Sequence, residues 1–171
     1  MEKKNNVMWE KGILLSLALI VVSLIFHFTS VEVTTKFQWV GYVVFVAGII
    51  IFTVMYGKQQ NGQATFGNLF AHGFKISAIV TLIMILWIVL SFKLIFPDSE
   101  EKIFQAIRTA ALKKGSNEQE ISQAMEITKK YLLTFLIGGM ILYYAILGVI
   151  GSLLGAAFSK KAPAGGSPFQ Q

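Results

Sequence analysis

The 171-residue chain contains no cysteine, only two histidines and a charged fraction of 14%. Without cysteine, disulfide bonds and thiolate chemistry are excluded. A typical soluble domain carries about 25% charged residues, whereas here 54% of all residues are hydrophobic. This composition indicates a membrane protein, and the length is typical of a single domain.

Charged residues are also missing from the core of each long apolar run. A charge at the centre of a bilayer costs about 2.5–3.5 kcal/mol on insertion scales, and such charges are normally kept for proton relays or ion paths. Their absence argues against an ion-coupled pump and against a polar catalytic site inside the membrane. The GxSxG, HExxH, P-loop and GxGxxG motifs are absent as well. We therefore expect no enzymatic activity.

The net charge of +6 comes from basic residues that flank the apolar runs and do not gather in one patch. Lys and Arg at the ends of apolar helices are typical of anchors at the bilayer surface. We therefore expect no nucleic-acid partner, and the partner that this charge pattern predicts is the lipid bilayer.

Four apolar runs are long enough to cross the roughly 30 Å hydrocarbon core, which needs about 20 residues of helix. They predict an all-α integral membrane protein with four transmembrane helices, at about residues 12–30, 39–56, 74–95 and 132–158. The first run is too long for the core of a usual signal peptide and is not followed by an A-x-A cleavage pattern, so we expect it to be retained. Trp39, Tyr42 and Tyr56 bracket the second run, as interfacial aromatic residues do.

Small residues recur at helical spacing along the fourth run, and they include a GxxxG pair. Such residues let helix backbones approach closely in lipid, where apolar surface alone gives no drive to associate. We predict that this stripe packs against the third or the first helix, or against a second copy of the chain; the alternative is a hinge or a pore contact. The predicted packing residues are Gly138, Ala145, Gly148, Gly151, Ser152 and Gly155.

One sizeable polar segment, residues 98–130, separates the third and fourth runs. Asp98 with Glu101, and Asn117 with Glu120, have the spacing of a capping box at a helix start. An amphipathic stripe follows each start. We therefore predict an amphipathic helical hairpin outside the bilayer, which closes on itself or docks a partner. The predicted hairpin contact residues are Ile103, Phe104, Ile107, Ile121 and Met125.

These elements predict a single four-helix membrane domain over residues 1–161 and a disordered, Pro- and Gly-rich tail over 162–171. Four spans place both ends of the chain on one side of the membrane. Of the 15 Lys and Arg residues, the terminal side has Lys3, Lys4, Lys11, Lys58, Lys75, Lys160 and Lys161. The positive-inside rule is thus nearly balanced, and we favour cytoplasmic termini because a Lys-rich segment precedes the first helix.

Two stretches resemble a known family. The segment from Gln63 to Lys75, QATFGNLFAHGFK, is similar to the FGQAFKxGF-type entry to the third span in a family of small bacterial membrane proteins, domain of unknown function 4199. The segment from Glu118 to Lys130, EQEISQAMEITKK, resembles the Glu- and Gln-rich stretch before that family's last span. The chain departs from the pattern at His72. The resemblance implies a four-helix protein of the bacterial inner membrane, and it brings no activity and no catalytic residues.

His27 and His72 are the two histidines, and on this topology they lie near opposite membrane faces. We interpret both as interfacial imidazoles and expect no metal site and no cofactor. Two functions remain open. The first is a non-catalytic membrane protein that acts by helix packing or by association with a membrane partner or a second copy. The alternative is a small transporter or permeation subunit, which would show a polar, water-lined cavity where an association module shows a solid bundle.

Overall fold

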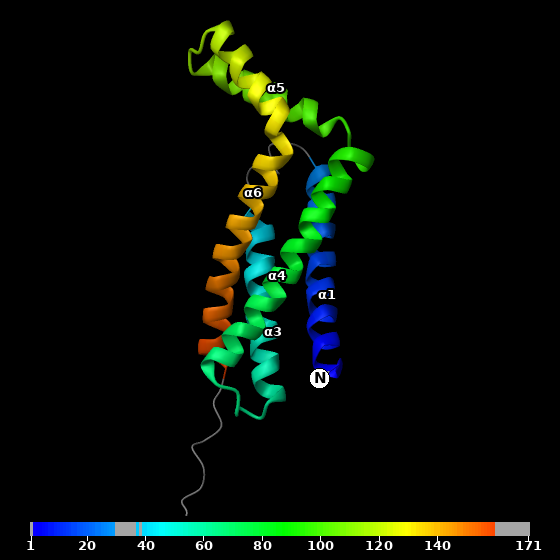
Figure 1. Ribbon diagram of the computed structural model, residues 1–171, viewed down its shortest axis with the longest axis vertical. Helices are drawn as coiled ribbons and strands as arrows, with labels where there is room; N and C mark the ends of the chain where they lie inside the picture. Colours follow the sequence, from blue (N-terminus) through cyan, green and yellow to red (C-terminus); the bar gives the residue numbers. More distant parts are fainter. Residues whose placement is uncertain (1, 30–36, 38, 160–171) are drawn as a thin grey trace, which may run out of the picture. The chain divides into compact units, whose positions relative to one another are not determined.

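The computed structural model describes residues 2–29, 37 and 39–159, with side chains from residue 7 onward. The helices in this part of the chain are α1 (Glu2–His27), α3 (Trp39–Gln59), α4 (Phe66–Leu90), η1 (Ser91–Ile95), α5 (Ser99–Lys113) and α6 (Glu118–Phe158), as Figure 1 shows. The element η1 is a short π-helix, and the described ranges contain no strand. The expected disordered tail over 162–171 and the side chains of Lys3 and Lys4 lie outside the described residues.

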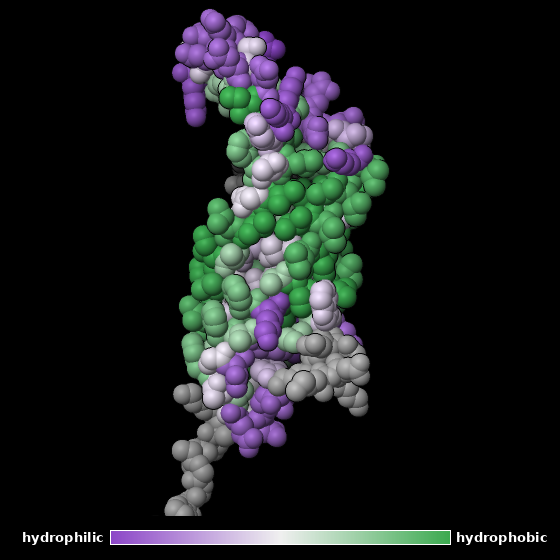
Figure 2. Space-filling view, viewed as in Figure 1, coloured by the Kyte–Doolittle hydropathy of each residue, from purple (hydrophilic) through white to green (hydrophobic). Residues whose placement is uncertain are grey.

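Four helical stretches are long and apolar enough to cross a membrane: Val7–His27, Trp39–Gln59, Phe66–Ile95 and Glu118–Phe158. This confirms the prediction of an all-α, multi-pass membrane protein. Large apolar side chains on these helices are exposed, among them Leu14 at 60% and Leu86 at 64%. Figure 2 shows a broad hydrophobic surface over the apolar helices, while hydrophilic residues gather over the α5–α6 hairpin. Exposed apolar area of this extent is unfavourable in water and suits contact with lipid.

The helices cluster into two compact units. The first unit contains α1, α3, the part of α4 up to Met84 and the part of α6 from Leu142. The second contains the rest of α4, η1, α5 and the part of α6 up to Ile141. The small-residue stripe predicted on the fourth span is therefore divided, because Gly138 belongs to the second unit and the other predicted packing residues to the first.

In the first unit, α1 packs against α3. Leu15 lies opposite Gly48, where an added Cβ would fall 2.5 Å from Leu15 Cδ1. Lys11, four residues before Leu15 on α1, faces Phe52, four residues after Gly48 on α3. The Lys11 Nζ lies 5.9 Å from the centroid of the Phe52 ring. These two contacts show that α1 and α3 are antiparallel, as expected for two helices joined by a short stretch of chain. The largest fully buried hydrophobic side chains of this unit are Phe45 and Ile49 of α3 and Ile76 and Val80 of α4.

Residues 66–73, which precede the predicted third span, continue into it as one helix, α4. Thr65 Oγ1 accepts a hydrogen bond from the Asn68 N–H (3.2 Å), which satisfies one free donor at the helix start. At the other end the N–H of Phe96 donates to the Ser91 carbonyl (2.7 Å) and closes the π-helix. Pro97 follows, and because it has no N–H the helix stops there.

The turn after α5 is closed by backbone hydrogen bonds. The Gly115 N–H donates to the Leu112 carbonyl (3.0 Å), and the Ser116 N–H donates to the Ala111 carbonyl (3.2 Å). This is the Schellman pattern, which places the residue after the helix in the left-handed region. Gly115 has φ +82°, so this position requires a residue without a Cβ.

The predicted capping box is present at the start of α6 and missing at the start of α5. Asn117 Oδ1 accepts from the Glu120 N–H (2.8 Å), and the Glu120 carboxylate accepts from the Asn117 N–H (3.3 Å). Asp98 makes no side-chain cap hydrogen bond, because its backbone is helical (φ −70°, ψ −9°) and an N-cap needs an extended backbone. Beyond its cap, α6 runs unbroken for 41 residues, about 61 Å.

We expect Gly115→Ala to destabilise the hairpin by about 1–2 kcal/mol, because a left-handed backbone is unfavourable for an L-residue. The control is Gly139→Ala, since a Cβ at Gly139 meets nothing within 4 Å and Ala is the better helix former. Amide hydrogen exchange over α5 should accelerate in the first variant and stay unchanged in the second. Equal exchange in both variants would show that this turn does not hold the hairpin.

Candidate functional site

A row of close helix contacts in the first unit lies along the buried face of α6. We call this contact the small-residue seam; it is formed by Ile49 and Thr53 of α3, Gly73 and Ser77 of α4, and Gly148, Gly151, Ser152 and Gly155 of α6. An added Cβ at Gly155 would lie 2.7 Å from Thr53 Cβ, and one at Gly151 would lie 3.1 Å from Ile49 Cβ. A Cβ at Gly148 would overlap the Ser77 hydroxyl. The glycines therefore set how closely α6 approaches its two neighbours.

Three helices converge at Gly73 of α4. A Cβ at this position would lie 2.5 Å from Thr53 Oγ1 of α3 and 2.8 Å from Ser152 Oγ of α6. Thr53 and Ser152 are both 0% exposed. Because apolar surface alone does not drive helices together in lipid, close packing of this kind contributes to their association.

The hydroxyl groups in the seam are satisfied by backbone carbonyls. Thr53 Oγ1 donates to the Ile49 carbonyl (2.8 Å), and Ser152 Oγ donates to the Gly148 carbonyl (2.6 Å), each on its own helix. Ser77 Oγ donates to the Tyr144 carbonyl (3.3 Å) and so links α4 to α6. Buried hydroxyls with such partners cost little in a low-dielectric interior. Each of these three hydroxyl groups therefore has a carbonyl acceptor within the packed helices.

The structure places the predicted packing residues in different surroundings. Gly148, Gly151, Ser152 and Gly155 are buried in the seam, and Ala145 is half-buried. Gly138 is exposed, and a Cβ there would meet nothing within 4 Å. A seven-residue repeat drifts by about 20° per heptad on a straight helix, so residues at this spacing do not all stay on one face of α6. The partners are the third span, which was one of the two predicted alternatives, and also the second span, which was not predicted.

An aromatic stack in the first unit contains one of the two histidines. The rings of Tyr56 and His72 are nearly parallel, at 9°, with centroids 3.9 Å apart, and both side chains are buried. Leu69 and Ala156 are buried in the same cluster as Tyr56. His27 is instead exposed at the end of α1, where its ring meets that of Phe28 edge-on at 5.4 Å. Among the described residues, no group of three or more His, Asp or Glu side chains could hold a metal ion.

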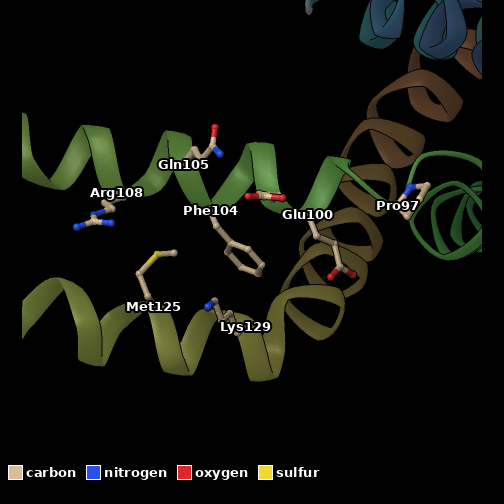
Figure 3. Close-up of a pocket in the computed structure, with 8 residues that line it drawn as sticks. Pro97, Glu100, Phe104, Gln105, Arg108, Met125 and Lys129 are labelled. Atoms are coloured by element: carbon tan, nitrogen blue, oxygen red, sulfur yellow. The ribbon is translucent and has the colours of Figure 1, made fainter.

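The second candidate site lies between α5 and the start of α6, entirely within the second unit. We call it the hairpin groove; its volume is about 540 Å³ and its lining residues are Pro97, Glu100, Glu101, Phe104, Gln105, Arg108, Met125 and Lys129. Figure 3 shows Phe104, Met125 and Lys129 pointing from the two helices into the space between them. The groove thus has an apolar floor and charged groups of both signs around it.

Polar and cationic contacts hold the two helices of the hairpin together. Arg108 Nη2 lies 3.3 Å from Glu118 Oε2, and Lys129 Nζ lies 5.8 Å from the centroid of the Phe104 ring. Ion pairs as exposed as this one add at most about 1 kcal/mol. Ile121 is 4% exposed and supplies the buried apolar contact. The hairpin is therefore held by several small contributions.

The predicted hairpin contact residues also differ in how deeply they are buried. Phe104 and Met125 line the groove, Ile121 is buried and Ile103 is half-buried. Ile107 is 36% exposed. On a helix with 3.6 residues per turn, a residue three positions after Phe104 is turned about 60° away from it, so Ile107 reaches the edge of the facing surface.

Sequence reasoning missed Lys11, which was interpreted as an interfacial anchor and is only 8% exposed. Its spacing carries the signal, because Lys11, Leu15 and Leu19 are four residues apart and share one helix face. Leu15 and Leu19 are 5% and 4% exposed, so this face is the buried one. Lys129 and Arg108 of the hairpin were missed as well, since only apolar residues were considered as contacts.

We expect Gly155→Leu to lower the melting temperature in detergent, because overpacking a tight contact costs about 1–3 kcal/mol. Gly138→Leu is the matched control: it adds the same side chain to the same helix, where a Cβ meets nothing within 4 Å. Circular dichroism at 222 nm against temperature measures both. If the Gly155 variant melts like the parent, the seam does not hold the helices together.

The family described as "Protein of unknown function (DUF4199)" matches residues 10–161. This confirms the resemblance that the two quoted segments indicate. No curated protein matches the chain, and no solved structure does.

Proposed function

The chain belongs to this DUF4199 family of proteins of unknown function, and we propose that it is a non-catalytic membrane protein that acts by association, with its hairpin groove binding a segment of a membrane-protein partner. The observation that carries the proposal is the groove itself: an extramembrane hairpin, held in shape by its own contacts, that keeps an apolar floor accessible.

The construction of the hairpin supports a recognition role. The Schellman turn, the Asn117–Glu120 capping box and the Arg108–Glu118 ion pair order two short helices that are marginal when isolated. A preordered surface binds a partner at a lower entropic cost. The groove keeps its shape before a partner arrives, which favours selective binding.

Charge indicates what the partner segment carries. Lys129 lies over the Phe104 ring and Arg108 is paired with Glu118. Glu100 and Glu101 line the same groove, and neither forms an ion pair with a described residue. The complementary segment therefore offers an apolar side chain to Phe104 and Met125 and a basic side chain to the two glutamates. Such complementarity favours correct orientation and fast association more than raw affinity.

The seam supports association over transport. Where α3, α4 and α6 meet, an added Cβ at Gly73 would lie within 3 Å of side chains from both neighbouring helices. A substrate path through this contact would require the helices to separate. The hydroxyls that such a path would use already donate to backbone carbonyls. This is the solid packing expected of an association module.

We further propose that the protein resides in a bacterial inner membrane with both termini in the cytoplasm. The basis is Lys3 and Lys4 at the start of α1, ahead of its apolar stretch Val7–His27, since basic segments that precede the first span usually remain cytoplasmic. On this orientation the hairpin groove faces the opposite compartment. Its partner would then be a membrane protein with a segment exposed on that side.

Reporter fusions test the orientation. A reporter active only in the cytoplasm should be active when fused after Gln171 and inactive when inserted at Gly115, with an export-dependent reporter giving the reverse. The opposite pattern at both positions would invert the orientation and keep the four spans. The same behaviour at both positions would contradict the count of four.

Site-specific photo-cross-linking tests the groove. A photoreactive residue at Gln105, which lines the groove, should give a discrete adduct with a membrane protein in native membranes. The control is the same substitution at Gln123, which is exposed on α6 and does not line the groove. Replacing both Glu100 and Glu101 by Gln should reduce the adduct, because the acidic groups that attract a basic segment are lost. Equal adducts from Gln105 and Gln123, or none from either, would contradict the proposal.

A further inference from the structure

The α5–α6 hairpin has a second exposed side, opposite the groove. On α5, Ile103 and Ile107 are each two positions from Gln105 of the groove, and so lie roughly 160° around the helix from it. On α6, Ile127 has the same relation to Lys129 of the groove, and it is 56% exposed. We call this side the back face; its residues are Ile103, Ala106, Ile107, Ala110, Ala124 and Ile127.

The back face is apolar although the hairpin around it is hydrophilic. Its residues on α5 follow the spacing i, i+3, i+4 and i+7, which makes one continuous stripe along a helix. The hairpin closes without this stripe, because Ile121, at 4% exposed, supplies its buried contact while Ile107 stays 36% exposed. Figure 2 shows hydrophilic residues gathered over the hairpin. Exposed apolar surface with a polar surround marks an interaction site.

Charges of opposite sign flank the back face at one end. Lys114 comes seven residues after Ile107 on α5, and Glu120 comes seven residues before Ile127 on α6, so each continues the stripe of its own helix. Both charged residues are exposed. A surface that carries an apolar stripe with a cation on one helix and an anion on the other is complementary to a copy of itself.

The contacts within one hairpin set the register between two. Lys129 of α6 lies over the Phe104 ring of α5, and Arg108 of α5 pairs with Glu118 of α6. By this register Ile103 of α5 lies level with Ile127 of α6. Two copies related by a two-fold axis along the hairpins keep residues of equal height together. The α5 helix of one copy then lies beside the α6 helix of the other, with opposite charges facing.

We propose that the back face binds the back face of a second copy of this chain, so that two hairpins form a four-helix bundle with α5 of each copy against α6 of the other. Ile103 packs on Ile127 of the second copy, and Lys114 pairs with Glu120 of the second copy. Glu120 accepts from the Asn117 N–H through Oε2 (3.3 Å), and its other oxygen accepts from the lysine. The groove stays on the outer side of the bundle, so this interface does not depend on what the groove binds.

An exchange of charges between copies tests the proposal. Light scattering measures the mass of the purified full chain in a neutral detergent, and the parent should be a dimer. Lys114→Glu and Glu120→Lys each place like charges across the interface, so each variant alone should associate about tenfold more weakly. An equal mixture of the two variants should regain the affinity of the parent, because every pair then has opposite signs. Mixing leaves the fold of each chain as it was, so the recovery reports the contact between copies.

Disulfide cross-linking in native membranes tests the register. A copy with Ile103→Cys and a differently tagged copy with Ile127→Cys should form a mixed disulfide dimer. Gln105→Cys in place of Ile103→Cys is the matched control, since it lies two residues further on α5 and on the groove side, and it should give no mixed dimer. A monomeric parent, a mixture of charge variants that associates no better than either alone, or equal cross-linking in the control would overturn the proposal. Dimers that form only through Ile107→Cys in both copies would overturn it as well, because they would indicate paired α5 helices.

Discussion

The first unit depends on the approach of three helix backbones at one point, where Gly73 of α4 lies against Thr53 of α3 and Ser152 of α6. In water, burial of apolar area would hold such helices together, but in lipid that drive is absent. Stability then comes from dispersion contacts at short range, which fall off steeply with a gap of even half an ångström. Larger side chains at Gly148, Gly151 or Gly155 would open such a gap. The buried hydroxyl groups of Thr53, Ser77 and Ser152 are accommodated because they donate to carbonyls on their own or a neighbouring helix.

The features that could be predicted from the sequence follow from bilayer thickness and helix geometry. Four apolar runs, the GxxxG pair and the Asn117–Glu120 box each express one dominant constraint, and the structure contains all of them. The features that could not be predicted depend on which face of a helix meets a neighbour. Gly138 has the same heptad spacing as Ser152, yet a Cβ at Gly138 would meet nothing within 4 Å. Asp98 has the spacing of an N-cap residue, but its backbone is helical. Lys11 lies where a bilayer anchor is expected, but its side chain is buried.

The polar chemistry of the described residues lies in a few small groups. In the first unit it consists of Lys11 and the Tyr56–His72 stack, and in the second unit of the charged lining of the hairpin groove. The seam between α3, α4 and α6 contains hydroxyls that are already satisfied by carbonyls. This distribution supports the association role proposed above.

The most direct test of this account is disulfide formation between Ile49→Cys and Gly151→Cys in native membranes. The chain has no cysteine of its own, so any disulfide bond must form between the two introduced residues. An added Cβ at Gly151 lies 3.1 Å from Ile49 Cβ, a few tenths of an ångström short of the roughly 3.5–4.5 Å that a disulfide spans. The account predicts rapid, nearly complete cross-linking within one chain, and none for Ile49→Cys paired with Gly138→Cys. Cross-linked dimers from the first pair, or no cross-link at all, would contradict a seam sealed within the monomer.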